Sequence, residues 1–136
     1  MGTWSYEPFG NDTAGDWAYG LDENPDLSYL QDAFEKVLAN GEEYLEAPDA
    51  EEAIAAAEVL AKVLGRGTQT DAYTESVDRW VGNLKSTPSA ELRRKASEAL
   101  LRVMAEDSEI TELWSEAEGA KEWRASIDRL RAAIEV

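Results

Sequence analysis

Apolar residues recur along this chain at intervals of three and four positions, the spacing that places side chains on one face of an α-helix. The clearest stripe runs through Ala120, Trp123, Ile127, Leu130 and Ile134. No run of strictly alternating apolar and polar residues stands out, and we therefore expect no substantial β-sheet. The pattern predicts an all-α fold, a bundle of about six or seven helices.

Glycine, proline and short polar residues divide these stripes into separate segments. Ahead of them, residues 1–10 form an aromatic arm that contains glycine and proline, and we expect this arm to pack on the bundle. The predicted helices cover residues 11–24, 26–40, 48–64, 71–84, 87–103, 108–118 and 120–134. No internal repeat or low-complexity linker interrupts them, which favours a single domain over residues 1–136.

Polar residues with short side chains suit several helix starts, because their oxygens accept hydrogen bonds from backbone N–H groups that the first turn leaves free. Asn11 or Asp12 fits the first helix, Thr87 followed by Pro88 the fifth, and Ser108 the sixth. Two shorter stripes predict further buried residues, which are Tyr73, Val77, Trp80, Val81 and Leu84 on the fourth helix and Ile110, Leu113, Trp114 and Ala117 on the sixth.

The third predicted helix is unusually rich in alanine. It begins near Pro48 or Asp49, with Glu52 three residues after Asp49 as in a capping box. Five of the nine residues 53–61 are alanine, and such small side chains let neighbouring helix backbones approach closely. We therefore expect this helix to lie at the centre of the bundle.

The same helix carries Glu58 inside its apolar segment. A buried carboxylate must pair or take up a proton, and Arg79, Arg102 or a tryptophan indole would be a suitable partner. The alternative is a functional site. The five tryptophans raise a similar choice between core packing and a ligand pocket or protein-binding anchors, and we expect at least three to lie in the core.

Length and composition narrow the class of protein. A chain of 136 residues can bury a core without a disulfide or a metal, and this one has no cysteine. No apolar run approaches the ~20 residues needed to cross a bilayer. The first residues also lack the basic start and apolar core of a signal peptide. These features predict a cytoplasmic protein.

Negative charge is the outstanding feature of the composition. The formal net charge is −16, and it is distributed unevenly. Residues 1–60 contain 15 acidic residues and one basic residue, Lys36, whereas residues 61–136 contain 14 acidic and 12 basic residues. Such a chain repels nucleic acids and anionic membranes and attracts basic proteins. The alternative is that acidity only maintains solubility, which explains the asymmetry less well.

Several kinds of catalytic chemistry have no residues to support them. The chain has neither histidine nor cysteine, and it shows no glycine-rich phosphate loop and no nucleophile elbow. Acidic residues at 12, 16, 22, 23 and 26 could hold Ca²⁺ or Mg²⁺, but the spacing of an EF-hand loop is missing. We therefore expect no metal, no other cofactor and no enzymatic activity.

The opening of the chain and several later segments match a known pattern. Residues 2–4 read Gly-Thr-Trp and residues 8–17 read Pro-Phe-Gly-Asn-Asp-Thr-Ala-Gly-Asp-Trp. The later segments are Ala-Ala-Ala-Glu at 55–58 and Ser-Glu-Ile-Thr-Glu-Leu-Trp-Ser-Glu at 108–116, followed by Trp123 and Leu130. The chain resembles the bacterial domain-of-unknown-function 4259 family over nearly its whole length. Ser5 stands where that family usually has glycine, and Ile110 where it usually has leucine.

The resemblance implies a structural motif rather than an activity, because the function of that family is not established. We expect Trp4, Phe9 and Trp17 to fasten the arm to the bundle, and Asn11, Asp12 and Asp16 to cap and orient the first helix. The residues assigned to the structural motif are Trp4, Phe9, Asn11, Asp12, Asp16, Trp17, Glu58, Trp114 and Trp123. Small acidic bacterial proteins of this kind are commonly proposed to confer immunity to a toxin.

The leading hypothesis is an immunity-type binding protein whose acidic surface covers the basic active region of a toxin or effector. Tyr44 and Leu45 would supply an apolar anchor within a charged rim. The residues expected to contact the partner are Asp22, Glu23, Asp26, Glu42, Glu43, Tyr44, Leu45, Glu46, Asp49, Glu51 and Glu52. Two alternatives remain: a structural or regulatory subunit that self-associates, and a carboxylate, metal-dependent enzyme built on Asp12, Asp16 and Glu58.

Overall fold

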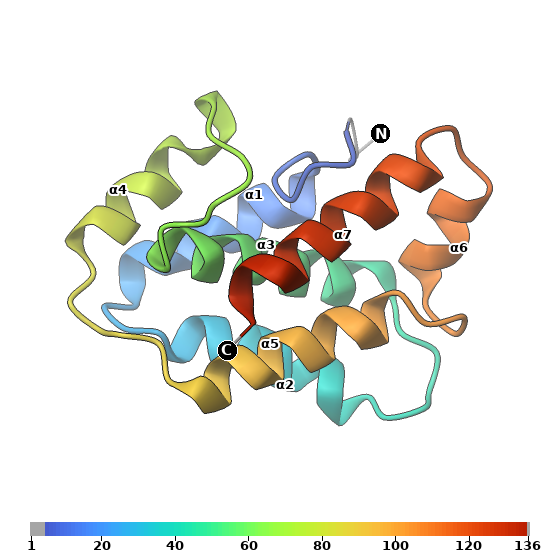
Figure 1. Ribbon diagram of the computed structural model, residues 1–136, viewed down its shortest axis with the longest axis horizontal. Coiled ribbons are helices and arrows are strands. Elements are labelled where there is room, and N and C mark those ends of the chain that lie inside the picture. The colour runs from blue at the N-terminus through green and yellow to red at the C-terminus, as the bar shows by residue number, and fades with distance from the viewer. Residues whose placement is uncertain (1–4, 136) are drawn as a thin grey trace.

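One alanine-rich helix, α3 (Ala47–Val63), passes through the middle of the computed structural model, which describes residues 5–135 (Figure 1). Helices α1, α2, α4, α5, α6 and α7 all contact it. Its residues 53–61 are buried without exception. The expectation that this helix is central is confirmed, and the small alanine side chains are what allow so many helices to pack around it.

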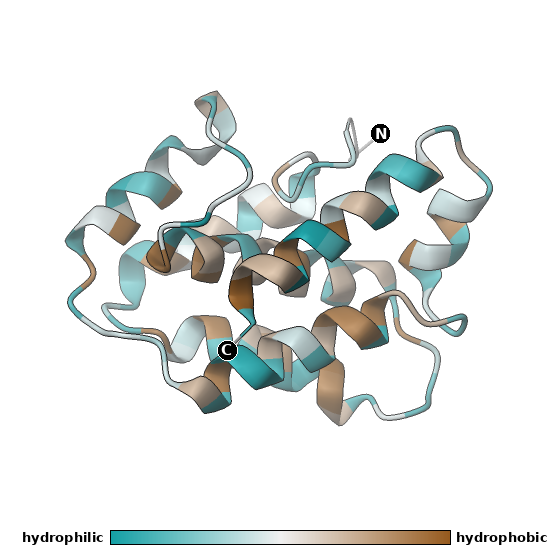
Figure 2. Cartoon of the chain, in the orientation of Figure 1, coloured by the Kyte–Doolittle hydropathy of each residue, from teal (hydrophilic) through white to brown (hydrophobic). Residues whose placement is uncertain are grey.

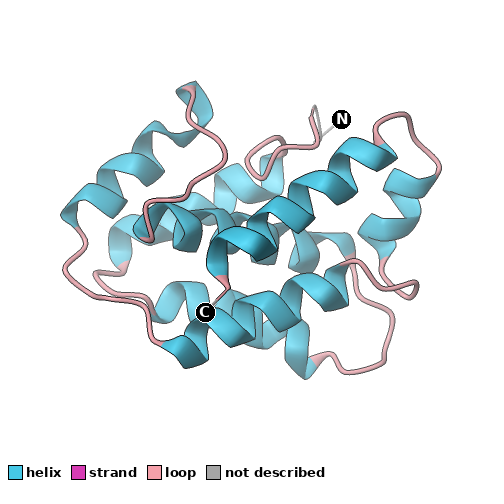
Figure 3. Ribbon diagram, viewed as in Figure 1, coloured by secondary structure: helices cyan, strands magenta, loops and turns pink. Residues whose placement is uncertain are grey.

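Helices make up the regular structure of the described residues, and no strand occurs among them (Figure 3). In chain order, the elements are α1 (Asp12–Ala18), the 3-10 helix η1 (Tyr19–Glu23), α2 (Ser28–Ala39), α3, the 3-10 helix η2 (Ala72–Thr74), α4 (Glu75–Asn83), α5 (Ala90–Val103), α6 (Glu109–Ser115) and α7 (Ala120–Ile134). The predicted all-α bundle is confirmed.

The helices surround α3 on several sides. Helices α2 and α5 pack against each other along one side of α3, and α7 crosses in front of α3 and also contacts α5 (Figure 1). Helices α4 and α6 lie at opposite ends of the molecule, beyond the two ends of α3. The outer helices carry both hydrophobic and hydrophilic residues, as amphipathic packing requires (Figure 2).

Short polar side chains cap α1 and α5, though not always at the predicted residue. The side chain of Asn11 accepts a hydrogen bond from the Ala14 N–H at 2.8 Å, which confirms one of the two predicted caps for α1. Helix α5 is capped by Ser89, whose Oγ accepts from the Leu92 N–H at 3.1 Å. The predicted Thr87 is wrong, because Pro88 lies before the helix rather than in its first turn.

Two other predicted caps fail because tertiary contacts replace local ones. The Asp49 and Glu52 side chains do not form a capping box but pair with Lys36 of α2, at 3.8 and 3.2 Å. The Glu109 carboxylate, from α6, instead accepts from the Ala47 N–H at 2.7 Å. Ser108 occupies the cap position of α6, but its buried Oγ has no hydrogen-bond partner within residues 5–135.

Three residues predicted to be buried lie on the surface. Tyr73 is 60% exposed because residues 72–74 form a separate 3-10 turn and do not continue the register of α4. Leu113 is 56% exposed. Ala117 is also exposed, since α6 ends at Ser115. The remaining residues of the two stripes are buried or half-buried, as expected.

The described part of the N-terminal arm packs on the bundle, as predicted. Phe9 is 2% exposed, and its backbone N–H donates to Gln69 Oε1 at 2.9 Å. The Ser126 hydroxyl, on α7, donates to the Tyr6 carbonyl at 3.4 Å. Trp4 lies outside the described residues.

Two members of the predicted opening motif have other roles. Trp17 stacks on Tyr29 of α2 with ring centroids 4.9 Å apart, and its carbonyl accepts from the Tyr29 hydroxyl at 2.6 Å. It therefore joins α1 to α2, and its expected role in fastening the arm stays a prediction. Asp12 lies in the first turn of α1, where a negative charge is favourable, but Asp16 is exposed further along the helix and does not cap it.

We expect Ala56→Leu, at a fully buried position of α3, to lower the free energy of unfolding by about 1–3 kcal/mol. The larger side chain has no space in a close-packed interior. Urea denaturation measures the change. Ala132→Leu on the exposed face of α7 is the control and should change stability little. Equal stability of the two variants would contradict the central role of α3.

Candidate functional site

Glu58 lies in the middle of α3 with no exposed surface. Its carboxylate accepts hydrogen bonds from the Thr68 N–H, the Thr68 hydroxyl and the Gln69 N–H, at 2.8, 2.6 and 2.8 Å. The Lys62 ammonium lies 3.9 Å away. The expectation of a buried, paired carboxylate is confirmed, but Arg79, Arg102 and a tryptophan indole are wrong as its partners.

The contacts of Glu58 continue into a network that fixes the loop after α3. Burial raises the pKa of the Glu58 carboxyl above its ordinary value, and the hydrogen bonds from Thr68 and Gln69 and the charge of Lys62 oppose that rise. Lys62 also pairs with Asp78 of α4 at 2.7 Å and donates to the Gln69 carbonyl. Because Gln69 in turn holds the arm through Phe9, the network joins α3, α4, the loop and the arm.

The tryptophans contribute chiefly to packing. Trp17, Trp80 and Trp123 are buried, which confirms the expectation that at least three lie in the core. Trp114 is half-buried and stacks on Trp123 with centroids 6.3 Å apart. Together with Glu58, these residues form a structural framework. We therefore look for the candidate binding site on the surface.

The structure divides the predicted partner-binding residues between two places. Asp22, Glu23 and Asp26 lie before α2, whereas Glu42, Glu43 and Glu46 follow it. The 12 residues of α2 separate the two groups by about 18 Å. Asp49 and Glu52, in the first turns of α3, both pair with Lys36 of α2. Glu51 is half-buried at the start of α3. The eleven residues therefore do not form one continuous patch.

Leu45 is the clearest error among the predicted contact residues. Its side chain has no exposed surface, so it cannot anchor a partner. Its backbone instead pairs with the loop before α6, where the Leu45 N–H donates to the Asp107 carbonyl at 3.0 Å and the Glu109 N–H donates to the Leu45 carbonyl at 2.8 Å. Through these two backbone hydrogen bonds, Leu45 fixes the loop between α2 and α3 to the start of α6.

Arg102 holds the same loop from the side. Its guanidinium donates to the carbonyls of Gly41, at 2.9 Å, and of Glu43, and also to the Asp107 carbonyl at 3.3 Å. A guanidinium presents several donors in a fixed plane, which suits such a cluster of carbonyls. The loop between α2 and α3 is therefore a preformed surface.

Helix α6 adds carboxylates that the charge imbalance of the sequence did not point to. The Tyr44 hydroxyl donates to Glu112 Oε2 at 2.8 Å, and Glu109 lies one turn earlier on the same helix. This hydrogen bond, with smaller contributions from burial and from the Glu112 and Glu109 charges, raises the pKa of Tyr44 to about 12. Sequence spacing could not predict this pairing, since Tyr44 and Glu112 are 68 positions apart and meet only in the folded protein.

These groups form one surface, which we call the acidic end. Tyr44 is 48% exposed and Leu113, beside Glu112, is 56% exposed. Positions 109, 112 and 113 lie on one side of α6 because they are three and four residues apart. The acidic end comprises Glu42, Glu43, Tyr44, Glu46, Glu109, Glu112 and Leu113, on the α2–α3 loop and α6 at the right of Figure 1.

The other candidate chemistry receives little support from the geometry. Within residues 5–135, no group of three or more acidic residues is placed to hold a metal ion. That range includes Asp12 and Asp16, the carboxylates considered for such a site. In the same range, no helix has the length and apolar character to span a membrane.

We expect Glu58→Gln to lower the free energy of unfolding by about 1–3 kcal/mol, because a neutral amide weakens the buried hydrogen bonds from Thr68 and Gln69 and removes the negative charge beside Lys62. Chemical denaturation provides the measurement. Glu116→Gln, at an exposed position, should change stability little. A fully stable Glu58→Gln protein would show that the network is not needed for folding.

The pKa of Tyr44 tests the pairing with Glu112. Absorbance titration of the phenols, with Tyr44→Phe as the difference reference, should give a pKa of about 12 for Tyr44. In Glu112→Gln the value should fall towards the ordinary value of ~10. Because the folded protein favours the neutral phenol, the small stabilising effect of the Tyr44–Glu112 hydrogen bond should be present below pH ~10. It should disappear as the pH rises through the pKa of Tyr44 in the folded protein. An unchanged value in Glu112→Gln would contradict the pairing.

Comparison with known proteins agrees with the resemblance seen in the sequence. Nothing matches the chain among curated proteins or among solved structures. The model of one family, described as a domain of unknown function (DUF4259), matches residues 2–126. That match covers the opening segment, Glu58, the acidic end and Trp123, and the chain therefore belongs to the DUF4259 family.

Proposed function

We propose that this protein is a non-enzymatic binding protein whose acidic end docks on a basic protein. The observation that supports the proposal is the arrangement of five carboxylates around exposed Tyr44 and Leu113, on a loop that Arg102 and the Leu45 backbone hold in place. A rigid surface with an apolar centre and a charged rim is typical of protein interfaces.

Most of the negative charge in the first part of the chain remains available to a partner. Ion pairs within the described residues engage Glu35, Asp49, Glu52 and Glu58 of residues 1–60, and no arginine takes part in them. The carboxylates of Glu42, Glu43 and Glu46 are exposed and belong to no such pair. Together with the net charge of −16, they would accelerate encounter with a cationic surface.

Tyr44 supplies a suitable centre for the interface. Tyrosine is enriched among residues that contribute most to binding. Its hydroxyl is already held by Glu112, so less side-chain freedom remains to be lost when a partner binds. Leu113, which follows Glu112 on α6, adds exposed apolar surface, and the carboxylates would form the rim.

An immunity-type role fits this chemistry. A toxin that acts on a nucleic acid must present lysine and arginine side chains to the phosphates of its substrate. A rigid group of carboxylates is complementary to that surface and would cover it. The proposed partner is accordingly a basic toxin or effector protein, and neither a nucleic acid nor an anionic membrane.

Self-association is the alternative that the exposed leucines raise. A two-fold dimer through the acidic end would bring the same carboxylates of two copies face to face, because each copy contributes the same patch. Like charges at that distance oppose association. The acidic end therefore favours a different, basic partner.

The triple variant Glu42→Lys, Glu43→Lys and Glu46→Lys should lose the partner. Pull-downs from lysate of the source organism should retain a basic protein on the wild type, less at 0.5 M than at about 0.05 M salt because screening weakens the contact. The purified partner should lose its toxic activity when the wild-type protein is added.

A matched control carries the same change in charge elsewhere. Glu75→Lys, Glu98→Lys and Asp128→Lys alter exposed positions on α4, α5 and α7, and this variant should still retain the partner. Retention by the acidic-end variant, at a level equal to the wild type, would exclude the acidic end as the docking surface. Circular dichroism establishes that both variants are folded.

A further inference from the structure

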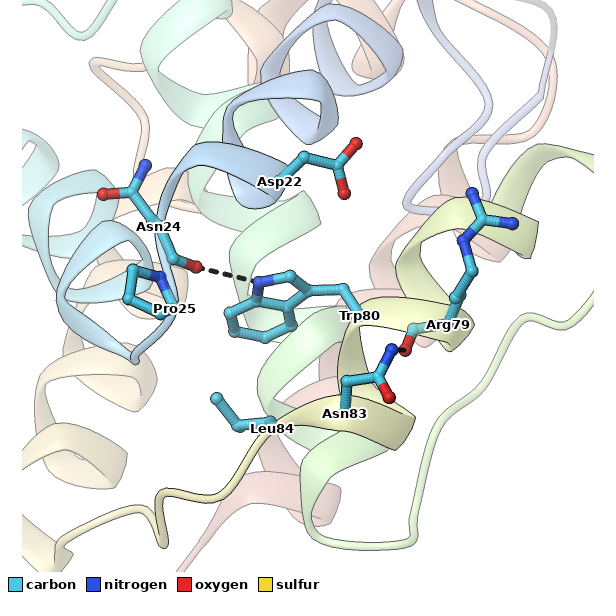
Figure 4. Close-up of a pocket in the computed structure, with 7 residues that line it drawn as sticks. All are labelled: Asp22, Asn24, Pro25, Arg79, Trp80, Asn83 and Leu84. Carbon is cyan, nitrogen blue, oxygen red and sulfur yellow. Dashed lines mark hydrogen bonds between the residues drawn. The ribbon is translucent and has the colours of Figure 1, made fainter.

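A hollow of about 270 Å³ lies between α4 and the segment that joins η1 to α2 (Figure 4). Asp22, Asn24, Pro25, Arg79, Trp80, Asn83 and Leu84 line it. It lies near the α4 end of the molecule, whereas the acidic end lies near α6 (Figure 1). Its volume is just below the range typical of pockets that bind drug-sized ligands, which suits a smaller metabolite.

The floor of the hollow is apolar and fixed in position. The Trp80 indole lies beside Pro25 and above Leu84 in Figure 4, and its N–H donates to the Asn24 carbonyl at 2.9 Å. Asn24 is held in turn, because its Nδ2 donates to the Gly20 carbonyl at 2.7 Å. The same element that carries Trp80 also positions Asn83, whose Nδ2 donates to the Arg79 carbonyl at 3.1 Å.

Two opposite charges at the hollow lack partners. Within the described residues, neither the Asp22 carboxylate nor the Arg79 guanidinium forms a hydrogen bond, and the two do not pair with each other within 4.0 Å. The hollow thus offers one cationic donor, Arg79, and one anionic acceptor, Asp22.

These groups define the chemistry of a ligand. A guanidinium binds a carboxylate through two parallel hydrogen bonds. An ammonium carries three donors and no acceptor, which matches the Asp22 carboxylate. The Trp80 ring, Pro25 and Leu84 can cover an aliphatic side chain.

We propose that the hollow binds a free amino acid with an apolar side chain. The ammonium lies on Asp22, the carboxylate on Arg79 and the side chain over Trp80. A simple amine would leave the Arg79 guanidinium without an anion, and a simple carboxylate would leave Asp22 without a cation. Because each alternative satisfies only half of the site, recognition requires both charges on one small molecule.

Titration of the full chain with leucine tests the site directly. The indole N–H resonance of Trp80, assigned with Trp80→Phe, should shift and saturate with a dissociation constant of about 1 mM or lower, as expected for so small a ligand. 3-Methylbutylamine, 4-methylpentanoate and N-acetylleucine amide, which lack one or both charges, should each bind about tenfold more weakly or worse.

Substitutions identify the two charged partners. Asp22→Asn and Arg79→Gln should each weaken leucine binding by about tenfold or more. Both side chains are exposed, so the fold should be retained, which the unchanged far-ultraviolet spectrum would show. Asp128→Asn and Arg129→Gln on the exposed face of α7 are matched controls and should bind leucine as the wild type does.

Three results would overturn the proposal. They are the absence of a saturable shift with leucine up to about 20 mM, equal binding of leucine and 3-methylbutylamine, and undiminished binding in Arg79→Gln. The titration is independent of the proposed docking function, because the triple lysine variant of the acidic end leaves the hollow intact. Loss of a protein partner and loss of leucine binding are therefore separate outcomes.

Discussion

Close packing around α3 is the constraint on which the remaining structure depends. Six helices contact this one helix, and they can do so because its buried face consists largely of alanine. A larger side chain at these positions would separate the backbones and displace several neighbours at once. Among residues 5–135, Glu58 is the one charged residue with no exposed surface, and it is tolerated because it accepts backbone N–H hydrogen bonds from the following loop.

Helical periodicity was sufficient to predict the α-helices but not the 3-10 helices η1 and η2, since a stripe such as Trp123, Ile127 and Leu130 depends only on local spacing. The errors arise where a distant residue competes with a local one. Asp49 and Glu52 would cap α3 by sequence rules, yet Lys36 attracts both and Glu109 takes over the cap. Rules based on local sequence cannot predict where Lys36 and Glu109 lie in the fold. The partners of Glu58 were missed because they too depend on how the chain folds back.

The candidate surface shows the same division. Glu42, Glu43 and Tyr44 were predicted from an acidic loop with an aromatic residue in it, and the structure exposes all three. Leu45 follows Tyr44 in the chain but points inward, because successive residues of an extended segment face opposite sides. The contribution of α6 depends on tertiary packing, and the charge count of the two chain halves concealed it.

The hydrogen bond from Phe9 to Gln69 has a consequence for how the chain opens. Chain termini usually fray independently, and their amides exchange with solvent long before those of the interior. Here the Phe9 N–H is hydrogen-bonded to the side chain of Gln69, whose own backbone N–H donates to the Glu58 carboxylate. Detachment of the loop after α3 would therefore also release the Phe9 amide, so the start of the chain and its midpoint are coupled.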